Sequence, residues 1–198
     1  MLLYDSAISG NCYKVRLLLA KLGITGYERR ELDVFDRSDR PGVLGELNPA
    51  LRVPTLVLDD GRVLAESGAI LFYLAEGTDF LPAERYERAQ VLQWMFFEQY
   101  DLEPNLAVLR FWEHAGLHRP EAEVQAKHDA GERVLAALDR ALTGREFLVA
   151  DRYSIADIAV YGYTHVAPEG GVTLQPFPAV QEWLARVAAH PGHIAMDA

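Results

Sequence analysis

Two polar residues stand where a helix is expected to begin, and they are the first candidates for chemistry. Ser9 and Asn11 flank the start of residues 11–22, where apolar side chains recur at helical spacing. The first N–H groups of a helix have no partner within it, and with the helix dipole they favour a bound anion. Either side chain can cap the helix or donate a hydrogen bond to a charged ligand, and both roles stay open.

Cys12 is the single cysteine of the chain. The thiolate is the reactive form of a cysteine, but a lone helical cysteine is more often buried and inert. One cysteine can form neither an internal disulfide nor a Cys-x-x-Cys centre, which fits a reducing compartment. We therefore expect a buried Cys12 and keep a catalytic Cys12 as the less favoured alternative.

A second helix is expected to begin at Glu66-Ser67. Its N-terminus is another potential anion site, where Ser67 either caps the helix or binds a carboxylate. Ser67 lacks the acidic partner three residues later that completes a capping box, which favours binding. In contrast, Ser154-Ile155-Ala156-Asp157 has this partner, and a capping box is predicted there.

The first 76 residues alternate between strand and helix patterns. Residues 2–4 and 27–33 flank the first helix as strands and predict a right-handed parallel crossover. Asp60-Gly61 is a strong turn signal and predicts a hairpin. A short helix before that hairpin and the helix from Ser67 after it complete the order β-α-β-α-β-β-α, which matches a thioredoxin-like α/β domain.

From Glu84 onward the patterns are helical, and Pro104 is expected to kink the first of these helices. We expect an α/β thioredoxin-like N-terminal domain at residues 1–77 and an all-helical C-terminal domain at residues 83–198. The expected helices of the second domain cover residues 84–112, 121–142, 154–166 and 177–189.

Composition narrows the function classes. Half of the 198 residues are apolar, as in ordinary globular proteins, and the net charge is −10. An acidic surface repels phosphate backbones and anionic lipids, so neither nucleic acid nor a membrane is an expected partner. The six histidines show no convincing metal-ligand spacing, and the N-terminus does not read as a signal peptide. We expect a cytoplasmic protein without a metal.

Four segments occur in the order and at the spacing found in one protein superfamily. Together they resemble the cytosolic glutathione S-transferases, and Phe97–Trp112 resembles a bacterial branch of that superfamily, of a serine or asparagine type. The four segments are Ser9-Gly10-Asn11-Cys12-Tyr13-Lys14-Val15, Asn48-Pro49-Ala50-Leu51-Arg52-Val53-Pro54-Thr55-Leu56, Glu66-Ser67-Gly68-Ala69-Ile70 and Ser154-Ile155-Ala156-Asp157.

The resemblance implies a fold and an activity. It implies that glutathione is the co-substrate, without a further cofactor, and that its thiolate attacks small hydrophobic electrophiles. Reduction of organic peroxides or disulfides is a plausible additional activity. A homodimer is also implied. A glutathione-binding or regulatory protein that kept the fold without catalysis is the alternative, although such relatives usually lose the serine donor or the Glu-Ser pair.

The resemblance also assigns roles to residues. Ser9 and Asn11 stabilise the thiolate, because a hydrogen-bond donor aimed at sulfur favours its charged form. A cis Val53-Pro54 bond presents Val53 to the cysteinyl backbone of glutathione, in the manner of an added strand. Glu66 holds the γ-glutamyl ammonium, and Ser67 binds the neighbouring carboxylate through its N–H and hydroxyl.

Three further assignments are less specific. Arg52 is the first candidate for the glycyl carboxylate, and Arg37 and Arg40 are alternatives. Tyr4 does not match the tyrosine of the tyrosine-type classes, and a catalytic Cys12 would form a mixed disulfide with glutathione. The electrophile is expected to bind between the domains, with Tyr100, Arg110 and Trp112 as candidates.

Overall fold

The computed structural model describes residues 1–198 and divides them into two compact units. The N-terminal unit comprises Met1–Glu76 together with Pro191–Ala198, and the helical unit comprises Gly77–His190. The sequence expectation placed the last eight residues with the helices, whereas the structure groups them with the α/β elements. None of the helices combines the length and apolar character needed to cross a bilayer.

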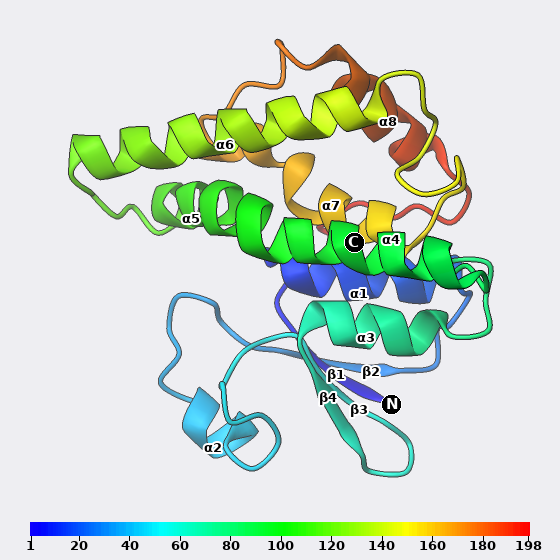
Figure 1. Ribbon diagram of the computed structural model, residues 1–198. Helices are drawn as coiled ribbons and strands as arrows, with labels where there is room; N and C mark the ends of the chain where they lie inside the picture. The colour runs from blue at the N-terminus through cyan, green and yellow to red at the C-terminus, as the bar shows by residue number, and fades with distance from the viewer. The chain divides into compact units, whose positions relative to one another are not determined.

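The N-terminal unit contains the expected thioredoxin-like arrangement (Figure 1). Its four strands have the order β2-β1-β3-β4, in which β2 is parallel to β1 and the other pairs are antiparallel. The β3–β4 hairpin turns at Gly61, whose φ of 84° suits glycine. The elements are β1 (Leu2–Asp5), α1 (Gly10–Lys21), β2 (Glu28–Glu31), α2 (Arg40–Leu44), β3 (Thr55–Val57), β4 (Val63–Ala65) and α3 (Ser67–Ala75).

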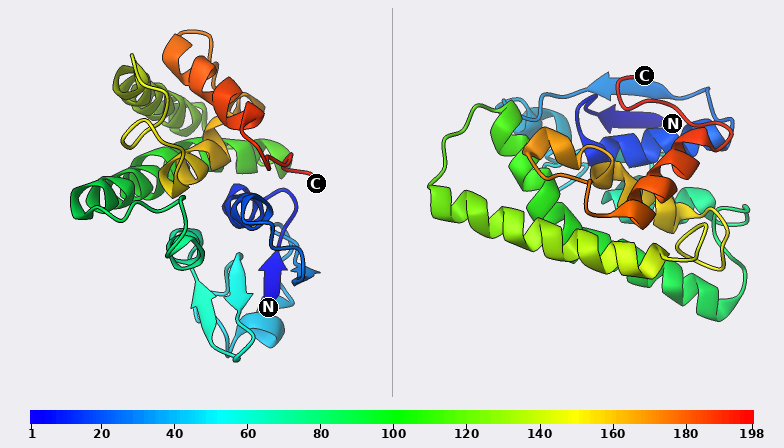
Figure 2. Two further views of the ribbon diagram at one scale, coloured as in Figure 1. Left: turned by 90° about the vertical axis from the view of Figure 1, so that its right-hand side faces the viewer. Right: turned by 90° about the horizontal axis from the view of Figure 1, so that it is seen from above.

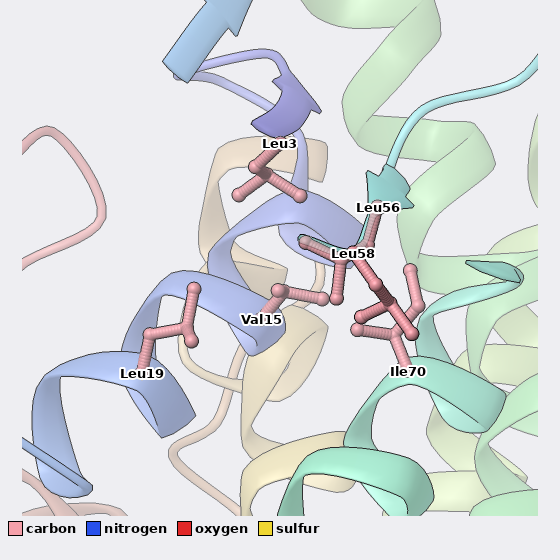
Figure 3. Packing of buried hydrophobic residues seen from close by; sticks show 6 residues of the cluster. All are labelled: Leu3, Val15, Leu19, Leu56, Leu58 and Ile70. Carbon is pink, nitrogen blue, oxygen red and sulfur yellow. The ribbon is translucent and has the colours of Figure 1, made fainter. Parts of the chain in front are cut away.

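Alternation along β1 explains the layers of this unit, because successive side chains of a strand point to opposite faces. Leu3 packs with residues of α1 and α3 on one face, as Figure 3 shows. Tyr4 packs on the other face with Leu44 of α2. The sheet therefore lies between α1 and α3 on one side and α2 on the other.

The helical unit follows the predicted pattern with one irregularity. Its elements are α4 (Arg85–Phe97), η1 (Glu98–Leu102), α5 (Glu103–His114), α6 (Glu121–Leu142), α7 (Ile155–Thr164), η2 (Ala167–Gly170) and α8 (Pro178–Ala189). The segment η1 is π-helical and ends two positions before Pro104. Proline has no N–H to donate to the preceding turn, which accounts for the disturbance at this point. The amide of Asn105 donates to the Asp101 carbonyl at 2.6 Å and satisfies one acceptor of this irregular turn.

The capping box predicted at α7 is confirmed. Ser154 Oγ accepts from the Ala156 N–H at 3.2 Å, and the Asp157 carboxylate accepts from the Ser154 N–H at 3.0 Å. Asp157 also accepts from the Leu148 N–H and from Trp183 Nε1, at 3.1 and 2.9 Å. The start of α7 thus joins a loop and α8 in one buried hydrogen-bond cluster.

The C-terminal segment is tied to α1 through its backbone carbonyls. Tyr13 donates to the Ile194 carbonyl at 2.8 Å, and Arg16 donates to the Met196 carbonyl at 2.5 Å. The red end of the chain accordingly lies beside the blue N-terminal elements in Figure 2. The helix whose first turn carries Ser9 and Asn11 is therefore held from the side by the last residues of the chain.

Candidate functional site

The loop between β1 and α1 is fixed by a buried ion pair. Arg16 Nη1 donates to both carboxylate oxygens of Asp5, at 2.7 and 3.0 Å, and both side chains are almost fully buried. The same guanidinium donates to the carbonyls of Ser6 and Ala7 at 3.2 and 3.0 Å. These bonds define the course of the chain immediately before Ser9.

Ser9 is the N-cap of α1. Its φ and ψ are −81° and 120°, and Oγ accepts from the Cys12 N–H at 3.3 Å. The first turn of α1 contains no acidic residue, so no carboxylate of this turn offsets the helix dipole. The capping role of Ser9 is present in the structure, and the residue is partly exposed.

Cys12 is completely buried on α1. Burial and the nearby Asp5 carboxylate raise the pKa of its thiol well above the ordinary value, and hydrogen bonds from Ser9 and Ser6 lower it by less. A thiol that stays protonated and has no access to solvent is a poor nucleophile. The geometry therefore disfavours Cys12 as the reacting group.

Asn11 connects the first turns of two helices. Its Oδ1 accepts a hydrogen bond from the Ser67 hydroxyl at 3.1 Å, and Ser67 is the first residue of α3. The same Oδ1 accepts from Lys14 Nζ at 2.7 Å. The first turns of two helices thus meet at one partly exposed residue, and the dipoles of both helices favour an anion at that place.

The N-terminus of α3 begins at a residue in an unusual conformation. Glu66 has φ 68° and ψ 121°, and its side chain makes no capping hydrogen bond. Such a backbone costs about 1–3 kcal/mol in a residue other than glycine, and strain of this kind is concentrated at ligand sites. Glu66 is exposed, whereas Ser67 is buried and its hydroxyl donates a hydrogen bond to Asn11.

The segment before β3 contains the predicted cis bond between Val53 and Pro54. Asn48 organises this segment: its amide donates to the Arg52 carbonyl at 3.0 Å and to Thr55 Oγ1 at 2.9 Å. Thr55 Oγ1 itself donates to the Arg52 carbonyl at 2.8 Å. Both polar side chains are buried, so the turn is determined by its own hydrogen bonds.

The three arginine candidates are separated by their environments. Arg52 is exposed. Arg40 is buried and donates to the carbonyls of Leu51 and Asp33, at 3.0 and 2.8 Å, which is a structural use of its guanidinium. Arg37 is exposed and donates through Nε to the Val34 carbonyl. The structure therefore favours Arg52 over Arg40 for a ligand carboxylate.

The candidates for the electrophile site lie within the helical unit, and each has a different environment. Tyr100 is 82% exposed in η1. Trp112 of α5 stacks under the Arg119 guanidinium, at 5.2 Å from the ring centroid. Arg110 is nearly buried and donates to Glu169 at 2.6 Å. The ion pair with Glu169 therefore fixes the orientation of the Arg110 guanidinium.

Several residues that build the site received no role from the sequence alone. Lys14, Asn48 and Arg16 fall into this group, although the first two lie inside the motifs quoted above. Lys14 follows Asn11 by three residues, which places both on the same side of a helix, and this spacing was the available signal. The role of Arg16 depends on Asp5 and on the loop between them, and helical spacing does not reveal that.

A thioredoxin-like unit followed by a helical unit is the architecture of the glutathione S-transferases. Residues 3–79 match the family model of the glutathione S-transferase N-terminal domain, and residues 88–191 match that of the C-terminal domain. The chain therefore belongs to the glutathione S-transferase family.

Individual relatives agree with this assignment. A glutathione S-transferase from Pseudomonas fluorescens Pf-5 superposes with a TM-score of 0.93, at 44% identity over 98% of each chain. A Pseudomonas putida glutathione transferase, solved with one glutathione disulfide per subunit, gives a TM-score of 0.84 at 29% identity over 96% of this chain and 87% of its own. The disulfide-bond oxidoreductase YfcG of Escherichia coli K12 is 33% identical over 77% of this chain and 74% of its own.

Proposed function

We propose that this chain is a glutathione transferase of a serine or asparagine type. Ser9 and Asn11 would stabilise the thiolate of bound glutathione, which then attacks a small hydrophobic electrophile. The observation that carries the proposal is the 3.1 Å hydrogen bond between Ser67 and Asn11. It brings together the first turns of α1 and α3, neither of which contains an acidic residue, so one would bind the sulfur and the other the γ-glutamyl carboxylate.

The remaining glutathione contacts follow from the same geometry. The Val53 backbone, beside cis Pro54 and just before β3, would pair with the cysteinyl unit like an added strand. Glu66 would hold the γ-glutamyl ammonium. Because the Ser67 hydroxyl already donates to Asn11, we assign the carboxylate to the Ser67 N–H. Exposed Arg52 would pair with the glycyl carboxylate.

The helical unit would supply the acceptor site and part of the assembly. Tyr100, Arg110 and Trp112 stay our candidates for contact with the electrophile. Exposed Phe96 and Tyr100 on neighbouring turns support a homodimer, because large apolar side chains at a surface favour a protein interface. A cytoplasmic location accords with the single reduced cysteine.

Disulfide reduction is a second candidate activity, and the similarity to a disulfide-bond oxidoreductase favours it. The bound thiolate would attack one sulfur of a disulfide, form a mixed disulfide and release the other sulfur as thiolate. A second glutathione would then release the product thiol and leave as glutathione disulfide. Because Cys12 is buried, we expect no glutathione adduct on it by mass spectrometry after treatment with glutathione disulfide.

The proposal is tested by calorimetry and by a conjugation assay with a chlorodinitrobenzene. We expect glutathione to bind at millimolar concentration or below, and cysteinylglycine, which lacks the γ-glutamyl group, to bind much more weakly. Equal affinities for the two peptides would contradict the roles of Glu66 and Ser67. Binding of glutathione without turnover of several electrophiles, peroxides or disulfides would favour a non-catalytic binding or regulatory protein.

A further inference from the structure

Arg16 joins two segments of the N-terminal unit that lie far apart in the sequence. Its Nη2 donates to the Ala7 carbonyl, in the loop before Ser9, at 3.0 Å and to the Met196 carbonyl of the C-terminal segment at 2.5 Å. Each Nη atom of a guanidinium carries two N–H groups, so these two carbonyls use both donors of Nη2. One nitrogen atom therefore connects the loop to the C-terminal segment.

The other contacts of the Arg16 guanidinium reinforce this connection. Its Nη1 donates to both carboxylate oxygens of Asp5 and to the Ser6 carbonyl. The Asp5 carboxylate also accepts from Arg29 Nε at 2.9 Å, and Arg29 Nη1 donates to the Ala198 carbonyl at 3.2 Å. Both arginines that neutralise the buried Asp5 therefore also bind the C-terminal segment.

Stability alone does not account for an arginine at this position. Burial of an ion pair costs hydration, and apolar side chains of similar volume often give equal or greater stability. A lysine would neutralise Asp5, but its ammonium is a point charge without the planar fork of a guanidinium. The fork of Arg16 reaches acceptors in β1, in the loop and in the C-terminal segment, which fits a residue that fixes these segments relative to one another.

The loop that Arg16 holds is the one that presents Ser9 at the start of α1. The Ser9 N–H donates to the Ser6 carbonyl at 3.0 Å, and the same carbonyl accepts from Arg16 at 3.2 Å. The Ala7 N–H is bound on the opposite side of its peptide by Glu31 Oε1 at 2.7 Å. A displacement of the Arg16 guanidinium would therefore reach Ser9 through a single shared carbonyl.

We propose that Arg16 is a positioning residue for the sulfur site, an inference that rests on the transferase function proposed above. Together with the C-terminal segment, it holds the loop that places Ser9 beside the glutathione thiolate. Without the fork of Arg16 or the Met196 carbonyl, the loop loses part of this support. The Ser9 hydroxyl then loses its alignment with the sulfur, and the charged form of the thiol is less favoured.

The test measures the pKa of glutathione bound to the full chain, from the ultraviolet absorbance of the thiolate against pH. In Arg16→Lys we expect this pKa to rise by about half to one unit and conjugation below it to slow by about three- to tenfold. Lysine keeps the positive charge, so the shift would not come from a lost cation. Affinity for glutathione at low pH, where the thiol is protonated, should stay within about threefold of the wild type, because Val53, Glu66 and Ser67 lie on other segments.

A second variant tests the part played by the C-terminal segment. Neither apolar cluster that flanks the sheet includes a residue of Pro191–Ala198, so a chain ending at His193 keeps these clusters. It lacks the Met196 acceptor and should shift the thiol pKa as Arg16→Lys does. A chain ending at Met196 is the matched control: it keeps that acceptor, loses the Arg29 contact to Ala198 and should have the thiol pKa of the full chain.

A Ser9→Ala background separates positioning from other roles. There, Arg16→Lys should have no further effect on the thiol pKa, because Arg16 acts through Ser9. An equal shift with and without Ser9 would overturn the inference. So would an unchanged thiol pKa in Arg16→Lys, even with reduced stability, since a purely structural arginine gives that result. If Arg16→Lys does not fold, the chain ending at His193 decides in the same way. Failure of the wild-type chain to bind glutathione would instead reject the proposed function itself.

Discussion

A serine caps one helix in each unit, Ser9 at α1 and Ser154 at α7, yet the two caps are built differently. Ser9 at α1 is partly exposed and makes one capping bond of 3.3 Å, with no acidic residue in the first turn. Ser154 at α7 is buried and shares a complete capping box with Asp157, which binds donors from a loop and from α8. The start of α7 is closed by a carboxylate of its own first turn, whereas the first turn of α1 contains no carboxylate.

The contrast shows how a structural helix start differs from a ligand-binding one. A carboxylate in the first turn offsets the helix dipole and occupies the free donors, so an anion has little to gain there. Helix α3 belongs with α1 in this respect, because its first turn has no acidic residue and Glu66 makes no capping bond. The four predictions below test this division into closed and open helix starts.

The largest expected effect on stability comes from removing the Asp157 carboxylate, which completes the capping box of α7. Asp157→Ala leaves the buried donors of Leu148 and Trp183 without an acceptor, and each such group costs about 1–3 kcal/mol. We expect the free energy of unfolding to fall by about 3–5 kcal/mol in urea titrations of the full chain. Asp129→Ala, which removes an exposed carboxylate from α6, is the control and should cost less than about 0.5 kcal/mol. Similar losses in both variants would refute a special role for the cap.

Removal of the Ser9 hydroxyl, which caps α1, should affect activity more than stability. Ser9→Ala should slow conjugation by about 10- to 1000-fold, if its hydroxyl contributes about 1.4–4 kcal/mol to the transition state. The lost capping bond should cost about 1 kcal/mol of stability. Ser154→Ala is the matched control, with a similar or greater loss of stability and no change in rate. An unchanged rate in Ser9→Ala would move thiolate stabilisation to Asn11.

Local signals in the sequence predicted most of the fold. Alternation in the strands, helical spacing, the Asp60-Gly61 turn and the Ser154–Asp157 box depend on neighbouring residues, and the structure contains all of them. Pro104 predicted a kink, and the structure has a π-helical turn shortly before it, whose form depends on how the backbone of the preceding residues is paired. The docking of Pro191–Ala198 on α1 was not predictable, because it uses backbone carbonyls that any sequence provides.

The sequence predicted individual residues of the candidate site but not the hydrogen bonds that join them. Ser9, Asn11 and Ser67 were selected from motifs, and the last two lie 56 positions apart in the chain. Their hydrogen bond arises from the packing of α1 beside α3, which no local pattern contains. The orientation of the Asn11 amide depends in turn on that bond and on Lys14. Long-range geometry therefore determines which of the candidate groups can act together.

Lowering the pH should increase the contribution of Asp157, at the start of α7, to the free energy of unfolding. Burial raises the pKa of the Asp157 carboxyl to about 6, although hydrogen bonds from Trp183, Leu148 and Ser154 lower it in part. This pKa lies above the unfolded value of about 3.9, so the folded state binds the proton more tightly than the unfolded state. Protonation of Asp157 therefore stabilises the fold at low pH, and this stabilisation is lost as pH rises through about 6. The advantage of wild type over Asp157→Asn should therefore grow by about 1 kcal/mol from about pH 7 to about pH 5. A constant difference across this range would contradict the raised pKa.

The smallest expected effect concerns the strained start of α3. Glycine adopts the φ of 68° at Glu66 without a Cβ penalty, but it loses more conformational entropy on folding. We therefore expect Glu66→Gly to leave stability unchanged or to raise it by about 0.5–1 kcal/mol in urea titrations. The same substitution should weaken glutathione binding several-fold in calorimetry, because it removes the proposed partner of the γ-glutamyl ammonium.

Glu66→Gln separates the two consequences, since glutamine keeps the backbone strain and loses the charge. We expect this variant to retain wild-type stability and to weaken glutathione binding in the same direction as Glu66→Gly. If Glu66→Gly bound glutathione as tightly as the wild type, the Glu66 carboxylate would have no part in binding the ligand. The role proposed for the start of α3 would then rest on the Ser67 N–H and the helix dipole, without a contribution from the Glu66 side chain.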